Sequence, residues 1–492
     1  MALREEPKVI RPMSNFCGTA VVCRYGLPSH LVGGSVESIR NAFHRAMALT
    51  VAEHPMLQVG ILNENSAVPS WIELETVDLG LHVSWQEIKA LDDYESSLKH
   101  EIRNQLDTWF TDVETKPGWR ISVLWPKGSI QSLDVIFCWN HTNFDGVGGK
   151  MLHQTLLRNL NDPKTHHELN LEGSVLHLSS TADRFPPPPE ELIKIPVSWG
   201  FALATIWKEL RPPFLVVSND PTQANWAPIR QEPYQTEFRT FSIEDATLKK
   251  VLSKCRAHRT TITGLLHALP LVSLALQLDE GKKHYKQEAK SMFAISALDT
   301  RRFIPANSEA YPWHVPSTTM DNQMTLVNHM FGEDLVTEIR SKAKEIPSQS
   351  QARTQLENFV WIAAVQARED IQNKLDKGME NDPSGLMKLV KDWRVQKKQQ
   401  LKKPRVGAWG VSNLGTLDGA VEGSGWKIER AVFQLSCELT SPVFHISSIS
   451  VKGKEMRVDV SWQQGIIDAE IGDTLASDME AWIRFLGAGG EK

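Results

Sequence analysis

The stretch from Val135 to Met151 (VIFCWNHTNFDGVGGKM) constrains the fold of this chain more than any other. An apolar run with strand character leads into a polar cluster, Asn140 to Asp145, which is followed by three glycines and then by leucines four residues apart. This order predicts a buried strand, a short polar loop and a helix that runs to about Asn161. The junction of a strand end with a helix start is where α/β proteins place their binding and catalytic groups.

His141 lies in this junction. Histidine is the side chain whose unperturbed pKa lies nearest to neutrality, which suits it to general base catalysis. The alternative is that His141 is an ordinary core or surface histidine and that Asp145 only caps the helix that follows. The residues alone leave both interpretations open.

With 492 residues, the chain is too long for one ordinary hydrophobic core, so we expect two domains. Prolines are frequent at 186–189 and recur at 212, 213, 221, 228 and 233. We therefore predict an N-terminal lobe over residues 1–210, a linker over 211–235 and a C-terminal lobe over 236–492. Strands and helices alternate in both parts, which predicts two α/β lobes.

Apolar periodicity predicts the individual elements. Strands are expected at 16–24, 57–62, 70–77, 119–125, 133–139, 291–298, 408–413, 432–438, 444–451 and 456–462. Helices are expected from a cap at Ser35 to residue 53, and at 95–106, 149–161, 195–210, 243–257, 263–278, 333–345, 351–376 and 472–486. The helix at 195–210 carries two tryptophans and is expected to pack against one lobe, whereas Pro270 is expected to kink or break the helix at 263–278.

Composition excludes several classes of protein. The formal net charge of −5 argues against a nucleic-acid binder, which would be strongly basic. The five cysteines lie mostly in apolar runs without metal-site spacing, so we expect reduced core thiols and no metal. No signal-peptide core is present, and the longest apolar stretch, 262–278, is shorter than the ~20 residues that span a bilayer. We expect a cytoplasmic protein without a transmembrane segment, while contact with a membrane surface is left open.

Four segments together resemble a known family. The segment from His141 to Gly146 (HTNFDG) resembles the HxxxDG signature of the CoA-dependent acyltransferase superfamily. That group includes chloramphenicol acetyltransferase, plant BAHD acyltransferases, fungal alcohol and trichothecene acetyltransferases, and condensation domains of peptide synthetases. Residues 53–57 (EHPML) are similar to its HPxL helix end, 298–301 (LDTR) to its [ND]xR strand end, and 410–415 (GVSNLG) to the SNLG segment of the alcohol acetyltransferase branch. Condensation domains carry a second histidine where this chain has Asn140, and the DFGWG segment of BAHD enzymes is missing, so the alcohol acetyltransferase branch fits best.

The resemblance implies an α/β fold of two chloramphenicol acetyltransferase-like lobes with the active-site tunnel between them. His141 would remove the proton from an acceptor hydroxyl as it attacks a thioester carbonyl, without an acyl-enzyme intermediate. Asp145 would point away from the substrate and pair with Arg301, and Arg302 is the alternative partner. Gly146 would leave room for the backbone at a tight turn.

The developing oxyanion needs a hydrogen-bond donor. Ser412 and Asn413 are candidates by their position in the family segment alone, and the alternative is that they form an ordinary turn.

The resemblance further implies acyl-CoA as co-substrate, no permanently bound cofactor and a monomer that acylates, with acetyl as the first choice, a hydroxyl of a hydrophobic secondary metabolite. The alternatives are condensation with an acyl carrier protein as donor, and an intramolecular cyclisation or pericyclic step. A different class is a catalytically silent scaffold that binds a carrier protein. The basic residues near the C-terminal side of the chain could meet CoA phosphates or a carrier protein, or could only be solvated: Lys391, Arg394, Lys397, Lys398, Lys402, Lys403 and Arg405.

Overall fold

A computed structural model of the chain describes residues 17–67, 69–89, 93–128, 130–162, 170–210, 220–279, 289–306, 308–346, 349–420 and 425–489. Most of the predicted linker, 220–235, is described, whereas its first part, 211–219, lies outside these ranges.

The first lobe is built around a five-stranded sheet with the order β14-β1-β7-β6-β5. Its strands are β1 (Thr19–Gly26), β5 (Val83–Ile88), β6 (Trp119–Pro126), β7 (Ser132–Trp139) and β14 (Lys427–Leu435). Helices α1 (Val36–Glu53) and α4 (Gly146–Asn161) cover one face, and α3 (Tyr94–Asp107) covers the other. Alternate residues of a strand point to opposite faces, and in β7 Phe137 packs with the first layer while Ile136 packs with α3. Burial on both faces explains why β7 is a continuous apolar run.

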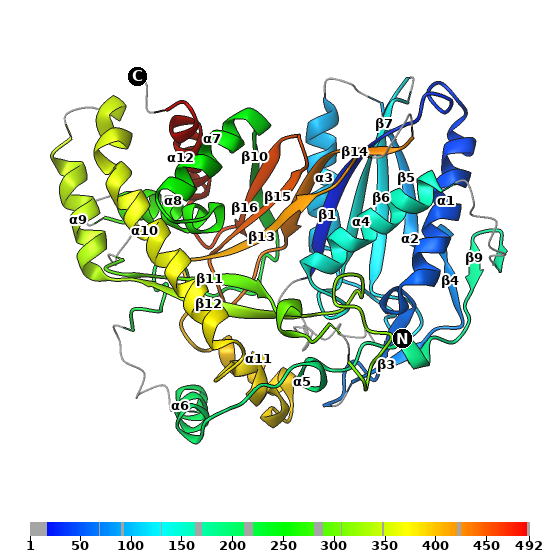
Figure 1. Cartoon of the computed structure of the whole chain (residues 1–492), viewed down its shortest axis with the longest axis horizontal. Coiled ribbons are helices and arrows are strands. Elements are labelled where there is room, and N and C mark those ends of the chain that lie inside the picture. Colours follow the sequence, from blue (N-terminus) through cyan, green and yellow to red (C-terminus); the bar gives the residue numbers. More distant parts are fainter. Residues whose placement is uncertain are drawn as a thin grey trace, which may run out of the picture.

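Strand β14 joins the first sheet although it lies late in the chain. It pairs antiparallel with β1, and Figure 1 shows this orange strand beside the blue one. The first sheet therefore combines strands from both halves of the sequence. The boundary at 211–235 stays a prediction. Strand β14 lies after this boundary in the sequence but belongs to the sheet of the first lobe.

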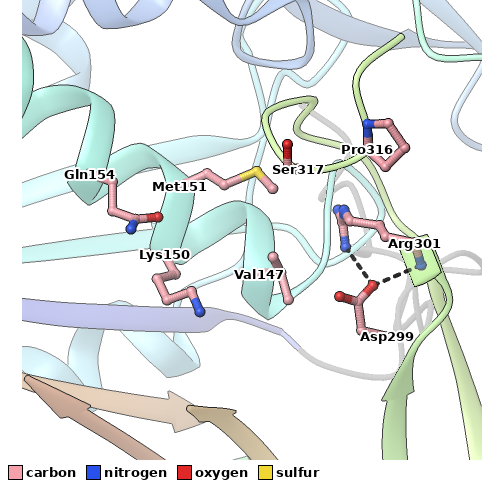
Figure 2. Close-up of a pocket in the computed structure, with 8 residues that line it drawn as sticks. All are labelled: Val147, Lys150, Met151, Gln154, Asp299, Arg301, Pro316 and Ser317. Atoms are coloured by element: carbon pink, nitrogen blue, oxygen red, sulfur yellow. Dashed lines mark hydrogen bonds and ion pairs between the residues drawn. The ribbon is translucent and has the colours of Figure 1, made fainter. Parts of the chain in front are cut away.

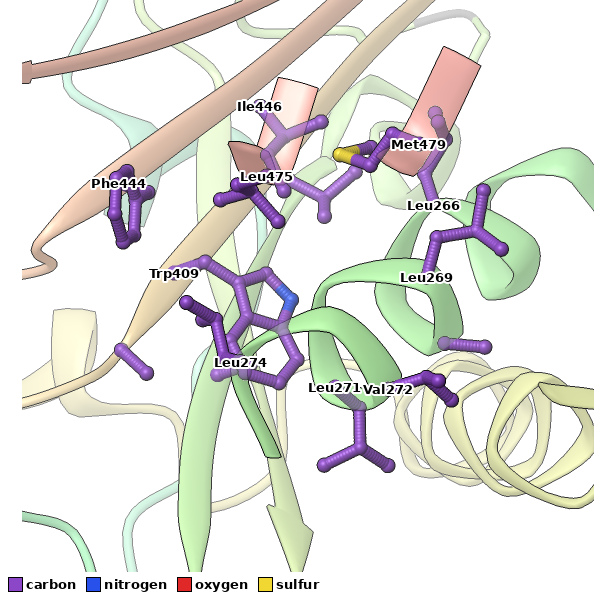
Figure 3. Close-up of a cluster of buried hydrophobic side chains, with 14 of the residues drawn as sticks. Leu266, Leu269, Leu271, Val272, Leu274, Trp409, Phe444, Ile446, Leu475 and Met479 are labelled. Carbon is purple, nitrogen blue, oxygen red and sulfur yellow. The ribbon is translucent and has the colours of Figure 1, made fainter. Parts of the chain in front are cut away.

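The second lobe contains a six-stranded sheet with the order β10-β16-β15-β13-β11-β12. Its strands are β10 (Thr236–Ile243), β11 (Met292–Asp299), β12 (Met324–Phe331), β13 (Trp409–Leu417), β15 (Phe444–Val451) and β16 (Met456–Gln463). The helices that pack on it or on each other are α7 (Asp245–Ala257), α8 (Ile262–Gln277), α9 (Glu333–Lys344), α10 (Gln349–Lys377) and α12 (Ala469–Gly487). Figure 3 shows Trp409 of this sheet among side chains from α8 and α12.

Smaller elements complete the described structure. Strands β2 (Val59–Leu62) and β3 (Ser70–Glu73) form one small sheet, and β4 (Thr76–Asp78), β9 (Val175–His177) and β8 (Leu171–Glu172) form another. The short helices are α2 (Leu79–His82), α5 (Pro189–Leu192), α6 (Trp199–Leu210) and α11 (Trp393–Gln400), and a 3₁₀ helix spans Pro383–Leu389.

Many predicted elements are confirmed within a few residues. Ser35 caps α1 by accepting a hydrogen bond from the backbone N of Ser38, and all five cysteines are buried and unpaired. Helix α8 continues through Pro270 inside the core, so a break at that residue is wrong, and a kink, the other expected outcome, stays a prediction. Strands β5, β10 and β12 and helix α11 were not predicted from the sequence. In the described ranges no single helix is long and apolar enough to span a membrane, and only the sharply bent pair α7–α8 meets that test jointly.

The expected packing of the helix at 195–210 is also wrong. The helix α6 forms there, but Trp199 and Trp207 are 86% and 61% exposed. The sequence showed an apolar helix, and an apolar sequence does not reveal which surface covers it.

Candidate active site

Aromatic packing fixes the end of β7, where the motif begins. The indole N–H of Trp139 donates to the backbone oxygen of Phe144 at 2.8 Å, and the two rings stack with centroids 5.2 Å apart. A Cβ at Gly149 would lie 2.2 Å from the Trp139 ring, so the helix approaches the strand end this closely only because residue 149 is glycine. The loop between Trp139 and Gly146 is thereby held between a buried strand and a buried helix.

Backbone contacts position His141 within this loop. Asn140 Oδ1 accepts from the backbone N and the hydroxyl of Thr142, which forms a tight Asx turn around His141. The Nδ2 of Asn322 donates to the His141 carbonyl oxygen at 2.8 Å. Burial lowers the pKa of His141 below the ordinary 6.5, and a hydrogen bond from the ring to its own backbone oxygen and the charge of Asp145 oppose that shift. His141 is therefore a neutral imidazole near pH 7.

Asp145 is engaged through both carboxylate oxygens. Oδ1 accepts from the backbone N of Gly148 and caps α4, while Oδ2 lies 2.6 Å from Arg301 Nη1 and 2.9 Å from the backbone N of Gln323. The cap and the ion pair coexist, and Arg302, the alternative partner, is exposed. The carboxylate thus ties the loop of the first lobe to the end of β11 in the second.

The same arginine binds further acidic groups that the sequence analysis missed. Its Nη2 donates to the carboxylate of Asp321 at 2.7 Å, and Asp321 Oδ2 lies 3.0 Å from His314 Nε2. Asp299 Oδ1 accepts a longer bond of 3.3 Å from Nη1. No motif marks Asp321, Asn322 or Gln323, and the available signal was a polar triplet immediately before β12, a strand that was not predicted either.

The space at Gly146 is limited by side chains rather than by a tight turn. A Cβ there would lie 2.8 Å from Leu414 Cδ2 and 3.0 Å from Phe433 Cζ. Leu414 is on β13 and Phe433 on β14, so the start of α4 contacts two strands from the C-terminal part of the chain. Lys150 Nζ also donates to the Leu414 carbonyl oxygen at 2.8 Å.

Residues 54–57, which follow α1, contact the loop between Trp139 and Gly146 and the neighbouring elements. The Met56 carbonyl oxygen accepts a long bond of 3.5 Å from Asn143 Nδ2, and the Leu57 carbonyl oxygen accepts one of 2.9 Å from the Trp119 indole. His54 Nε2 lies 3.0 Å from the Thr155 hydroxyl on α4. The HPxL-like segment therefore contacts the motif.

Ser412 and Asn413 lie on β13, immediately before Leu414. Asn413 Nδ2 donates to the Thr263 hydroxyl at 3.1 Å, and its Oδ1 accepts from the backbone N of Gly415. Both polar atoms of the Asn413 amide therefore make local contacts, and the bond to Thr263 uses one of the two N–H groups on Nδ2. The structure brings β13 to the motif through Leu414, and the oxyanion role of Ser412 or Asn413 stays a prediction.

A pocket of about 380 Å³ lies between the first turns of α4, the end of β11 and residues 316–317 (Figure 2). Its lining residues are Val147, Lys150, Met151, Gln154, Asp299, Arg301, Pro316 and Ser317. His141 is not among them, and the charge of Arg301 is balanced by its carboxylate partners. The pocket adjoins the ion pair of Asp145 and Arg301.

The predicted basic stretch extends from α11 into the segment before β13. Lys391, Lys398 and Lys402 are exposed, whereas Arg405 is buried and donates to the Glu438 carbonyl oxygen at 2.9 Å. These residues do not share one surface, because Arg405 belongs to the interior of the second lobe.

Comparisons with known proteins agree with this architecture. Residues 88–472 match the alcohol acetyltransferase family. A probable alcohol acetyltransferase, FCK4 of Fusarium pseudograminearum, is 27% identical over 461 residues, which cover 92% of this chain and 87% of that protein.

Two solved structures share the fold. The trichothecene 15-O-acetyltransferase TRI3 of Fusarium sporotrichioides superposes with a TM-score of 0.66 at 13% identity, covering 96% of this chain and 92% of the other. The first condensation domain of the calcium-dependent antibiotic synthetase superposes with a TM-score of 0.57 at 13% identity, covering 97% and 91%. These neighbours have two lobes, as expected here. The chain belongs to the alcohol acetyltransferase family, within the clan of CoA-dependent acyltransferases and condensation domains.

Proposed function

We propose that this chain transfers an acetyl group from acetyl-CoA to a hydroxyl of a hydrophobic secondary metabolite, with His141 as the general base. The observation that carries the proposal is the way the motif is held. Asp145 uses both oxygens to fix the loop, which leaves its histidine as the group placed to handle a proton. The family membership of the chain supports the reaction class.

The chemistry of the imidazole fits this role. A neutral imidazole has one nitrogen that donates and one that accepts. A hydrogen bond from one ring nitrogen of His141 to its own backbone oxygen would set the tautomer and leave the other nitrogen as the base. That nitrogen would take the proton of the acceptor hydroxyl while the hydroxyl oxygen attacks the thioester carbonyl. The CoA thiolate would then leave, and no covalent acyl-enzyme would form.

Asp145 and Arg301 act as positioning residues in this proposal. The buried pair keeps the carboxylate turned towards the second lobe, so the charge of Asp145 is compensated before substrate binds. Ser412 and Asn413 both remain candidates for the oxyanion donor, since the bond to Thr263 uses only one of the two N–H groups on Asn413 Nδ2. The substrates would meet in a tunnel between the lobes of a monomer.

The test is incubation of the purified chain with acetyl-CoA and a panel of hydrophobic alcohols. We expect release of free CoA and products that have gained the mass of an acetyl group. Products of unchanged mass would favour an intramolecular cyclisation instead. Turnover only with a carrier-protein-bound donor would favour condensation.

A further inference from the structure

Helix α6 presents four large apolar side chains to solvent. Trp199, Leu203, Ile206 and Trp207 are 86%, 66%, 38% and 61% exposed. Their spacing of four, three and one residues places them on one face of the helix. The half-buried residues Phe201, Ala202 and Thr205 lie away from this face. The face with the two tryptophans, Leu203 and Ile206 is therefore turned away from the described part of the protein.

The position of α6 is fixed at its N-terminal end. Leu192 and Ile193 pack with Ile304 and Met379 in a small buried cluster just before the helix. The backbone N of Ser198 donates to Asn381 Oδ1 at 2.8 Å, and the Pro196 carbonyl oxygen accepts from the backbone N of Asn381 at 2.9 Å. The helix that carries the exposed apolar face is therefore attached to the rest of the protein at its N-terminal end.

A second exposed apolar segment follows directly after this anchor. Met387, Leu389 and Val395 are 51%, 55% and 52% exposed. Val197 packs against Gly385 of the same segment, where a Cβ would lie 2.7 Å from Val197 Cγ2. Together with α6, these residues account for seven of the sixteen large hydrophobic side chains that are exposed in the described ranges. Figure 1 shows α5, α6 and α11 along the lower edge of the molecule.

Positive charge accompanies these apolar side chains. Residues 387–402 contain six basic residues and one acidic residue, in a chain whose net charge is −5. Exposed lysines lie around both segments, at Lys194, Lys208, Lys391, Lys398 and Lys402. This edge thus combines protruding tryptophan and leucine side chains with flanking lysines.

We propose that α6 and residues 387–402 form a docking surface for a membrane that contains anionic phospholipids. Helices that lie in a membrane interface have an apolar face with Trp, Phe or Leu and basic residues beside it. Tryptophan concentrates at the level of the lipid headgroups, and lysines near the surface are attracted to anionic lipids. The surface would hold the enzyme where hydrophobic alcohols dissolve.

The charges and the shape favour a membrane over a protein partner. Two copies of this edge packed face to face would bring their lysines together, and like charges repel. The apolar side chains protrude from the edge, and a protruding apolar helix inserts into a soft bilayer without a preformed complementary groove.

The experiment is sedimentation of the full chain with vesicles of phosphatidylcholine alone and of phosphatidylcholine mixed with phosphatidylserine. We expect binding to the mixed vesicles that weakens in high salt. The double variant Trp199→Ser/Trp207→Ser should bind at least about tenfold more weakly. Lys398→Glu/Lys402→Glu should weaken binding by about fivefold or more per lysine.

Matched controls lie elsewhere on the surface. Trp71→Ser removes an exposed tryptophan of β3, and Lys454→Glu inverts an exposed charge on the turn between β15 and β16. Both should bind vesicles as the wild type does, and all variants should melt cooperatively because the changed residues are exposed. The proposal is overturned if the wild type ignores vesicles, or if the α6 variants bind as the controls do. It is equally overturned if Trp199→Ser/Trp207→Ser turns a dimer into a monomer, or if an acidic carrier protein binds the edge and vesicles do not.

Discussion

Arg301 and Asp145 are 156 residues apart in the sequence and form a buried ion pair of 2.6 Å that joins the two lobes at the HTNFDG segment. The pair lies within a wider set of contacts, since Arg301 also binds the carboxylate of Asp321. Removing one partner of such a pair leaves an uncompensated buried charge.

We therefore expect Arg301→Ala to lower the free energy of unfolding by about 3–5 kcal/mol. Arg302→Ala is the matched control, because Arg302 is the next residue in the chain and is exposed. It should change stability by less than about 0.5 kcal/mol. Urea denaturation of the two variants checks this, and equal losses in both would argue against the ion pair as a tie between the lobes.

Gly146→Ala should destabilise the protein by about 1–3 kcal/mol, because the new methyl group has no space against Leu414 and Phe433. Gly200→Ala on α6 is the control, since a Cβ there meets nothing within 4 Å. Adding Leu414→Ala to Gly146→Ala should recover part of the loss in a double-mutant cycle. Purely additive effects would show that Leu414 is not the obstacle.

A chain of buried hydrogen bonds in the second lobe has only one consistent direction. The Trp409 indole donates to His267 Nδ1 at 3.0 Å, so His267 Nε2 donates to the Ser296 hydroxyl, which donates to His329 Nε2. His329 Nδ1 then donates to Asp370 at 3.0 Å. Burial lowers the pKa of His267 well below its ordinary range, which agrees with a neutral ring.

Ser296→Ala removes the middle of this chain and leaves two imidazole nitrogens without partners. We expect a loss of about 1–3 kcal/mol for each nitrogen left unsatisfied. Ser477→Ala, at an exposed position of α12, should stay within about 0.5 kcal/mol of the wild type in thermal or urea unfolding. A Ser296→Ala protein as stable as that control would show that the buried hydroxyl is dispensable.

Asp459 gives a pH dependence of stability that can be tested. Burial raises the pKa of its carboxyl to about 7, against hydrogen bonds from Thr240 and Gln434 that lower it. A group whose folded pKa lies above its unfolded pKa contributes stability at low pH, and that contribution is lost as the pH rises towards the folded value.

Asp459→Asn removes this titration while it keeps an acceptor for Thr240 and Gln434. The variant should gain stability relative to the wild type between about pH 4 and about pH 7, by an amount on the order of 4 kcal/mol. Urea midpoints of both proteins measured across this range check the sign. A stability difference that is independent of pH would contradict a raised pKa.

The sequence was informative where local patterns decide the structure. Strand β7, helix α4 and the cap at Ser35 follow from apolar periodicity and from a side chain that bonds its own backbone neighbours. Arg301 was proposed as the partner of Asp145 only through the family resemblance. Contacts that depend on tertiary structure were not visible, including the pairing of β14 with β1 and the contact of Asp321 with Arg301. The exposure of Trp199 was missed for the same reason, because an apolar helix has the same sequence pattern whether the protein or another surface covers it.

The most direct test of the account compares the rate of acetyl transfer in the wild type and in His141→Ala, with exposed His30→Ala as the control. Loss of a general base lowers the rate by about 10²–10⁴-fold. We predict a loss of that size in a His141→Ala protein that still melts cooperatively, and an unchanged rate in His30→Ala. A His141→Ala enzyme that retains most of its acetyl transfer would contradict the assignment of His141 as the catalytic base.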